Sequence, residues 1–145
     1  MTEIWKPVPY KLYAKSYEVS NLGRIRSVDR TVVKSNGVTA PVKGRMLKPR
    51  QIKLHYTVEL CSSIDKSRVR RTSCLSRLVA ECFVNRPPNT DCVIHIDRDY
   101  SNNAASNLKW VSQSYINSRR IQEHPHLRNI IRDINIEKTT LRQAQ

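Results

Sequence analysis

The sequence has few of the features that would place it among disulfide-stabilised, zinc-stabilised or membrane-embedded proteins. Its four cysteines, Cys61, Cys74, Cys82 and Cys92, form no Cys-x-x-Cys pair, so a structural zinc site is not expected. No apolar run is long enough to span a bilayer, and the N-terminus does not have the pattern of a signal peptide. We therefore expect a cytoplasmic protein whose thiols are free and pack as small core residues.

Acidic residues are also scarce, with 12 Asp and Glu against 26 Lys and Arg, which gives a net charge of +14. The excess is uneven: residues 1–50 hold 11 basic and 3 acidic residues, whereas residues 91–145 hold 8 and 6. A balance of this size favours nucleic acid as the partner, with the N-terminal third as the phosphate anchor. The alternative is that the charge only keeps the protein soluble.

A chain of 145 residues with 39% apolar residues supports one domain with a modest core, or one small domain with an appendage. Alternating patterns predict two β-hairpins. The first joins residues 17–20 to 25–28 through a turn in which Gly23 can take a positive φ, and the second joins 55–61 to 68–73. Residues 3–9 are expected to be extended, and residues 31–49 are polar and basic, with a turn signal at 35–37.

Two stretches have helical patterns. Leu75, Leu78, Val79 and Cys82 share one apolar face, which predicts a helix over residues 75–83. A second apolar face at Leu127, Ile130, Ile131 and Ile134 predicts a helix near the C-terminus. Between them, His124-Pro125-His126 is interpreted as a surface loop, with a metal site as the alternative.

Residues 93–120 carry the pattern that is richest in chemistry. The β-branched run at 93–96 predicts a strand, the Asp, Asn and Ser residues of 97–106 predict a long loop, and 108–111 alternates as a second strand. Ser112 is the expected N-cap of a helix that runs through Arg119 and Arg120. The order is therefore strand, loop, strand, helix.

Within this frame, His95, the pair Asn102-Asn103, Asn107-Leu108, Trp110-Val111 and Asn117 resemble the HNH nuclease motif, the ββα-metal fold. The resemblance is closest to the homing endonucleases of phages and group I introns. Upstream, Tyr17-x-Val-Ser-Asn-x-Gly-x-Ile resembles the small β-module that precedes many of these nucleases and is associated with DNA contact.

The resemblance implies an α+β fold, in which a small N-terminal β-sheet module is followed by an HNH nuclease domain. The expected divisions are a basic module at 1–50, a nuclease domain at 51–123 and a helical tail at 124–145. The implied activity is that of a phage-type DNA endonuclease which hydrolyses double-stranded DNA. The sequence does not indicate an oligomeric state.

Cleavage of a phosphodiester by water needs a base and a cation that stabilises the leaving oxygen. The resemblance makes His95 the general base and gives Asn107 the task of pinning the loop. It makes Asn117 a ligand of a divalent metal, Mg²⁺ or Mn²⁺. Asp97 is interpreted first as a structural residue of the loop and second as a substitute ligand.

The chain also departs from the family pattern. The residue before the base, usually a metal ligand, is Ile94, and the position six residues after Trp110 is Ile116, so that Asn117 is one residue out of register. Arg98 replaces a usual Gly, and Ser76 replaces a common His. These departures support an alternative, a DNA-binding protein on an HNH scaffold with weak or lost cleavage.

A third alternative, an RNA-binding module, has the charge in its favour but lacks an aromatic RNA-binding signature. For DNA, basic side chains on the two hairpins, in the loop and on the last helix of the motif are the expected phosphate contacts. They are Arg24, Arg26, Arg30, Arg68, Arg70, Arg71, Arg98, Arg119 and Arg120.

Overall fold

The computed structural model describes residues 2–34, 36–64 and 67–124. The chain divides into two compact units, one made of residues 1–88 with 93–110 and the other of residues 89–92 with 111–145. The boundaries expected after residues 50 and 123 stay a prediction. The expected C-terminal helix, and Pro125 and His126 of the His-Pro-His stretch, lie outside the described residues.

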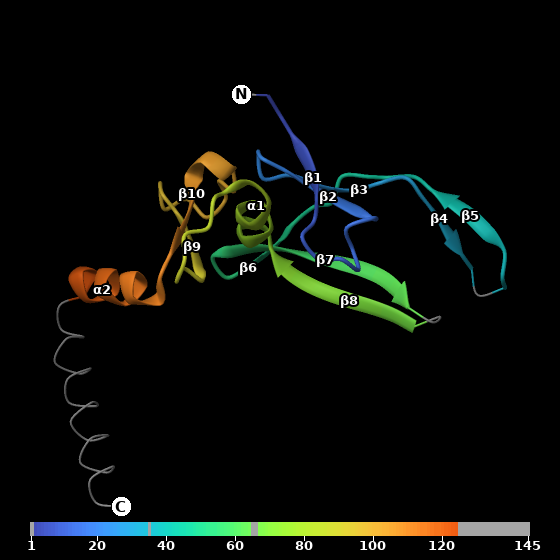
Figure 1. Ribbon diagram of the computed structural model, residues 1–145. Helices are drawn as coiled ribbons and strands as arrows, with labels where there is room; N and C mark the ends of the chain where they lie inside the picture. Colours follow the sequence, from blue (N-terminus) through green and yellow to red (C-terminus); the bar gives the residue numbers. More distant parts are fainter. Residues whose placement is uncertain (1, 35, 65–66, 125–145) are drawn as a thin grey trace, which may run out of the picture. The chain divides into compact units, whose positions relative to one another are not determined.

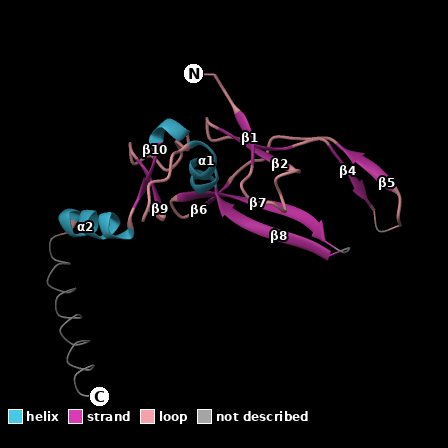
Figure 2. Ribbon diagram, viewed as in Figure 1, coloured by secondary structure: helices cyan, strands magenta, loops and turns pink. Residues whose placement is uncertain are grey.

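The described residues form small antiparallel sheets and short helices, which confirms the α+β class (Figures 1 and 2). The N-terminal sheet has the order β1-β2-β3. Its strands are β1 (Trp5–Pro7), β2 (Tyr17–Ser20) and β3 (Ile25–Ser27), and Tyr17 pairs with Ser27, so the first expected hairpin is confirmed. Val19 on β2 and Ile25 on β3 are fully buried in the core.

The basic segment that follows contains a hairpin which the sequence analysis did not predict beyond its turn. Strands β4 (Arg30–Val33) and β5 (Thr39–Val42) pair around Gly37, whose φ is +82°. Neither strand has a fully buried residue, and Val33 is 71% exposed. Hydrophobic alternation is therefore a weak signal here, because it arises where one face of a strand is buried.

The next sheet supports the first helix. Strands β6 (Arg50–Ile52), β7 (His55–Ile64) and β8 (Ser67–Cys74) are antiparallel neighbours, and the second expected hairpin is confirmed. Helix α1 (Leu75–Phe83) follows directly and packs against β2, β7 and β8, as Figure 1 shows. Leu75, Leu78 and Val79 are buried, as their spacing predicted, whereas Cys82 is half-buried. Burial raises the pKa of the Cys82 thiol to about 11.

The strand-loop-strand part of the motif is also confirmed. Strands β9 (Cys92–His95) and β10 (Leu108–Val111) pair, and the loop between them ends in the short helix η1 (Ala105–Asn107). Trp110 is buried, and its Nε1 donates a hydrogen bond of 3.4 Å to the carbonyl oxygen of Ala80 on α1. One core therefore joins the N-terminal strands, α1 and β10. It consists of Val8, Tyr13, Tyr17, Val19, Ile25, Val58, Leu60, Leu75, Leu78, Val79, Ala80, Leu108 and Trp110.

The second unit contains helix α2 (Gln113–Glu123). The Oγ atom of Ser112 accepts a hydrogen bond of 3.2 Å from the backbone N–H of Tyr115, so the expected N-cap is confirmed. Arg119 pairs with Glu123 one turn later at 3.1 Å. Neither of the helices described as α1 and α2 is long and apolar enough to cross a membrane.

Candidate active site

The loop between β9 and β10 is held by hydrogen bonds between its own side chains and backbone. The Oδ1 atom of Asp97 accepts from the backbone N–H of Asp99, and the Oδ1 atom of Asp99 accepts from that of Ser101, both at 2.8 Å. The Oδ2 atom of Asp97 accepts from Asn102 at 2.7 Å. Asp and Asn side chains commonly close turns in this way, which explains why the sequence predicts a loop here.

Asn107 links the two ends of this loop. Its Oδ1 atom accepts a hydrogen bond of 3.1 Å from the backbone N–H of Asp97. Its Nδ2 atom donates to the Asp97 carboxylate and to the carbonyl oxygen of Asn102, both at 2.8 Å. Asn107 is 8% exposed. Because these bonds lie in a nearly buried position, they fix where the chain leaves β9, directly after His95.

His95 is 5% exposed, and its Nε2 atom lies 3.1 Å from the Oδ1 atom of Asn103. The orientation of the Asn103 amide is set by its NH₂ group, which donates to the carbonyl oxygens of Tyr100 (3.3 Å) and Ser101 (3.1 Å). An amide oxygen can only accept, so Nε2 of His95 must carry the hydrogen. In the neutral imidazole, Nδ1 then holds the lone pair.

Nδ1 of His95 has no hydrogen-bond partner among the described residues. The atoms that are both fully buried and unpartnered in the described part of the chain are Arg30 Nη1 and Ser73 Oγ, so Nδ1 of His95 does not belong to that group. This nearly buried histidine therefore has one ring nitrogen that its protein neighbours leave unbonded. This arrangement can accept a proton from a water molecule.

Tyr100 and His55, which no sequence pattern singled out, form a row of rings with His95. The Tyr100 ring lies 5.2 Å from the His95 ring at an interplanar angle of 58°. Its other neighbour is the exposed His55 ring at the start of β7, also at 5.2 Å and nearly perpendicular. Offset and edge-to-face pairs of this kind are favourable. The separation of 45 residues between His55 and Tyr100 gives no local sequence signal for the contact.

The predicted metal ligands have different surroundings. The pKa of Asp97 is lowered, mainly by the hydrogen bond from Asn102 and then by that from Asn107, so the exposed carboxylate is ionised at neutral pH. Asn117 lies exposed on α2, where its Oδ1 atom accepts a hydrogen bond of 3.1 Å from Gln113. Asp97 and Asn117 fall in different units. Residues 2–34, 36–64 and 67–124 contain no group of three or more His, Cys, Asp or Glu side chains arranged to hold a metal.

Arg98 has a left-handed backbone with a φ of +65°. Residues with a Cβ atom adopt this conformation at a cost of about 1–2 kcal/mol, which glycine avoids. The glycine expected at this position from the family pattern is thus explained by the turn, and the turn persists when arginine replaces it.

The arginines of the first hairpin are engaged within the protein. Arg24 forms an ion pair with Glu3, and Arg26 pairs with Glu18 at 2.7 Å. The guanidinium of Arg26 also lies 4.2 Å from the centre of the Trp5 ring. These groups are partly exposed, and exposed ion pairs contribute only about 0–1 kcal/mol. The two ion pairs therefore contribute little to holding these guanidinium groups in place.

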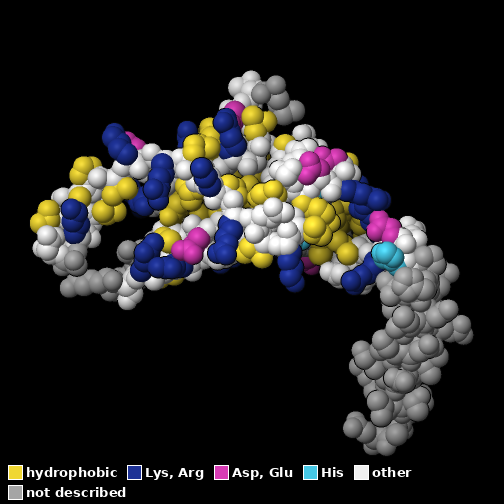
Figure 3. All heavy atoms as spheres, turned by 180° about the vertical axis from the view of Figure 1, so that it is seen from behind, with side chains coloured by type: hydrophobic (Ala, Val, Ile, Leu, Met, Phe, Trp, Pro, Cys, Tyr) yellow, Lys and Arg dark blue, Asp and Glu magenta, His cyan; other side chains and the backbone are white. Residues whose placement is uncertain are grey.

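The remaining predicted DNA contacts on the strands also have local partners. Arg70 lies 3.6 Å from Glu59, and the Arg71 guanidinium lies 3.8 Å from the centre of the Tyr10 ring. Arg68 contacts the Cys61 sulfur at 3.5 Å, and the Arg30 guanidinium lies near the Tyr17 ring. Figure 3 shows Lys and Arg side chains over one face of the strands, with acidic side chains scattered among them. On α2, Arg120 is exposed and Arg119 is paired as described above.

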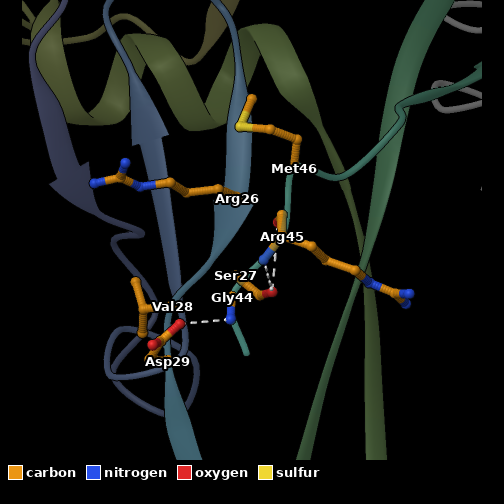
Figure 4. Close-up of a pocket in the computed structure, with 7 residues that line it drawn as sticks. All are labelled: Arg26, Ser27, Val28, Asp29, Gly44, Arg45 and Met46. Carbon is orange, nitrogen blue, oxygen red and sulfur yellow. Dashed lines mark hydrogen bonds between the residues drawn. The ribbon is translucent and has the colours of Figure 1, made fainter. Parts of the chain in front are cut away.

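An open pocket of about 370 Å³ lies beside β3, and residues 26–29 and 44–46 line it (Figure 4). None of its lining residues belongs to the loop that follows His95. Gly44 allows its segment to pack on β3, since a Cβ atom there would lie 2.4 Å from the carbonyl oxygen of Ser27. Asp29 accepts a hydrogen bond of 2.7 Å from the Gly44 N–H. Figure 4 shows the side chains of Arg26 and Arg45 pointing in opposite directions, so the pocket has no converging charges.

Comparison with known proteins finds one matching family model and two relatives with the same description. Residues 3–58 match the family model of the NUMOD4 motif. Two uncharacterized HNH endonucleases of Acanthamoeba polyphaga mimivirus are 32% identical over 100 residues and 31% identical over 115 residues. These matches cover 69% and 78% of this chain, but the chain spans only about a quarter of the length of either relative.

The fold is similar to that of a solved nuclease. The structure of the HNH homing endonuclease I-HmuI, described as binding and cleaving DNA, matches with a TM-score of 0.50 and 23% sequence identity. The match covers 84% of this chain and 59% of that chain. It confirms the fold class expected from the sequence.

Proposed function

Because the chain carries the NUMOD4 motif and is a relative of the HNH endonucleases, we propose that it hydrolyses phosphodiester bonds of double-stranded DNA with His95 as the general base. HNH endonucleases as a family cleave nucleic acid, and the fold is that of a homing endonuclease which binds and cleaves DNA. The assignment of His95 and of DNA as substrate to this chain is the proposal.

The observation that carries the proposal is the hydrogen bond between His95 Nε2 and Asn103 Oδ1. It requires a proton on Nε2, so that whenever the imidazole is neutral its lone pair is on Nδ1. Asn107 also supports the role of His95 as the base, because its bonds to Asp97 and Asn102 fix the loop that follows His95 and ends before β10. A base whose ring is held in this way needs little reorganisation before it accepts a proton.

In the proposed reaction, Nδ1 of His95 accepts a proton from water while the water oxygen attacks phosphorus. The bond to the opposite, leaving oxygen breaks, and that oxygen departs with the electron pair and is then protonated by solvent. Arginines on the strands bind the flanking phosphates.

HNH nucleases generally use a divalent metal ion, which stabilises the charge on the leaving oxygen. The donors predicted for it, the ionised Asp97 carboxylate and the Asn117 amide oxygen, are the hard oxygen ligands that Mg²⁺ and Mn²⁺ prefer. A cation that keeps most of its waters needs only one or two such oxygens. We therefore propose Mg²⁺ or Mn²⁺ as the cofactor.

Cleavage of supercoiled plasmid with Mg²⁺ or Mn²⁺, by the wild type beside His95→Ala, tests the proposal. We expect the wild type to nick or linearise the plasmid and the variant to lose about 10²–10⁴-fold in rate, the usual contribution of a general base. A gel-shift assay should show equal DNA binding by both. Equal cleavage by His95→Ala would remove His95 from the reaction.

A second candidate function, DNA binding without efficient cleavage, is favoured by Ile94. Its side chain has no oxygen at the position before the base, where the family usually has a metal ligand. Retarded DNA on the gel, with an intact plasmid at every metal concentration, would support this candidate and contradict the nuclease.

A further inference from the structure

Several hydrogen bonds hold the turn between β2 and β3. The Ser20 Oγ atom accepts from the N–H of Arg24 at 3.0 Å, and the Gly23 N–H donates to the Ser20 carbonyl at 3.1 Å. Ser20 is fully buried. The side chain of Asn21 ties the turn to the N-terminal segment, because its Oδ1 atom accepts from the N–H of Ile4 at 2.8 Å.

This turn lies directly against the loop that holds His95. The carbonyl oxygen of Asn21 accepts a hydrogen bond of 2.8 Å from the N–H of Ala105. Gly23 has a φ of +80°, and a Cβ atom there would lie 2.8 Å from the carbonyl carbon and oxygen of Asn103 and 2.9 Å from its Cβ. Because Gly23 has no side chain, the backbone of Asn103 can occupy the space where a Cβ atom would otherwise lie.

Asn103 is the residue whose amide oxygen faces Nε2 of His95. A chain of direct contacts therefore runs from Gly23 through Asn103 to the imidazole. Ser20, Asn21 and Gly23 all lie within the NUMOD4 match at residues 3–58, whereas Asn103 and His95 lie in the HNH motif.

We propose that Gly23 and the turn around it position the catalytic base, so that the N-terminal module contributes to the cleavage step and not only to DNA contact. The inference rests on the proposed function, because it takes His95 as the base. A Cβ atom at residue 23 would displace the Asn103 backbone and with it the side-chain amide. That amide sets both the orientation and the tautomer of the His95 ring. A displacement of about 1 Å at a catalytic group can cost about 10²-fold in rate.

Gly23→Ala tests this inference, and the chain offers a matched control. Gly37 has nearly the same φ, +82°, but a Cβ atom there would meet nothing within 4 Å. Gly37→Ala therefore brings the same left-handed backbone strain without a new contact. Comparing the two variants separates the strain of the turn from the push on Asn103.

Ala105→Pro is an independent test that introduces no clash at Gly23. Proline removes the N–H that bonds to Asn21. Ala105 is the first residue of η1, a position that suits proline, and Ala104 already has the φ of −63° and ψ of 140° that a residue before proline adopts. In proline the Cδ atom takes the direction of the amide hydrogen, so it would lie far inside van der Waals contact of the Asn21 oxygen, which is 2.8 Å from the Ala105 nitrogen. This variant therefore breaks the hydrogen bond and moves the turn away from the loop, without adding a contact between Gly23 and Asn103.

The measurements are the single-turnover cleavage rate at saturating DNA and the Kd for the same DNA. We expect Gly23→Ala and Ala105→Pro to lose about 10-fold or more in rate while Kd changes less than about twofold, and Gly37→Ala to cleave like the wild type. Equal rates for Gly23→Ala and Gly37→Ala, or a loss confined to Kd, would overturn the proposal. If Gly23→Ala does not fold, the same criteria applied to Ala105→Pro decide.

A readout that needs no activity separates this inference from the proposed function. Long-range ¹H–¹⁵N NMR spectra of the histidine rings report which nitrogen carries the proton, and His95→Ala assigns the His95 signals. We expect the Nε2–H form of His95 to give way to a mixture in Gly23→Ala but not in Gly37→Ala. An unchanged His95 ring in Gly23→Ala would overturn the inference, whereas a wild type that binds but never cleaves would overturn the proposed function alone.

Discussion

Polar side chains in the loop from Asp97 to Asn107 bond to one another and to the loop backbone, whereas Arg24, Arg26 and Arg70 on the strands each pair with one glutamate at the surface. The first kind of network fixes a geometry before any ligand arrives, because its members satisfy one another's hydrogen bonds around the buried Asn107. The second kind leaves charges that can exchange one anionic partner for another. We therefore infer that the loop carries the chemistry and the strands carry the binding.

Apart from loss of the base itself, the largest expected effect comes from breaking the loop network at its centre. Asn107→Ala would leave the Asp97 N–H and the Asn102 carbonyl without their bonds, and an unsatisfied buried group costs about 1–3 kcal/mol. We expect a lower melting temperature and a cleavage rate reduced by about 10²-fold, because the loop no longer fixes the position of His95. Thermal unfolding and single-turnover cleavage measure the two losses.

Asn102→Ala is the control for this prediction, since it removes a bond from the exposed edge of the same loop. Its losses in stability and rate should be smaller than those of Asn107→Ala. Equal effects from the two variants would mean that the loop is not organised around Asn107.

A smaller effect is expected at the strands, and it should appear in binding alone. Replacing Arg24 and Arg26 by Gln removes two proposed phosphate contacts, so the slope of log K against log salt should fall by about one for each. The maximal cleavage rate should stay near that of the wild type. Filter binding over a range of salt concentrations measures the slope.

Replacing the acidic partners of Arg24 and Arg26 should change DNA affinity in the opposite direction. Glu3→Gln and Glu18→Gln release Arg24 and Arg26 from their ion pairs, so DNA binding should tighten modestly. If neither pair of substitutions changes the salt dependence, the first hairpin does not contact DNA.

Local patterns predicted several elements because the signals for them lie within one element. The apolar face of Leu75, Leu78 and Val79 located α1 at residues 75–83, and Ser112 marked the start of α2. The β4–β5 hairpin was missed beyond its turn because its strands bury no residue fully. The motif also predicted that His95 ends a strand and that Asn107 lies at the end of the loop which follows it.

Contacts between distant segments were not predictable in the same way. Gly23 could be assigned a positive φ from its turn, but its contact with Asn103 depends on how two segments 80 residues apart pack. The same holds for His55 beside Tyr100. The catalytic roles of His95 and Asn107, the ligand roles of Asp97 and Asn117, and the DNA-contact roles of the nine arginines all stay predictions.

The state of the His95 ring in the wild-type protein tests the central claim most directly. Long-range ¹H–¹⁵N NMR at a pH where the imidazole is neutral should show the proton on Nε2, hydrogen-bonded to Asn103, and an unprotonated Nδ1. Asn103→Ala should lose this preference. A proton on Nδ1 in the wild type would contradict the account, because the nitrogen that the protein leaves unbonded could not then act as the base.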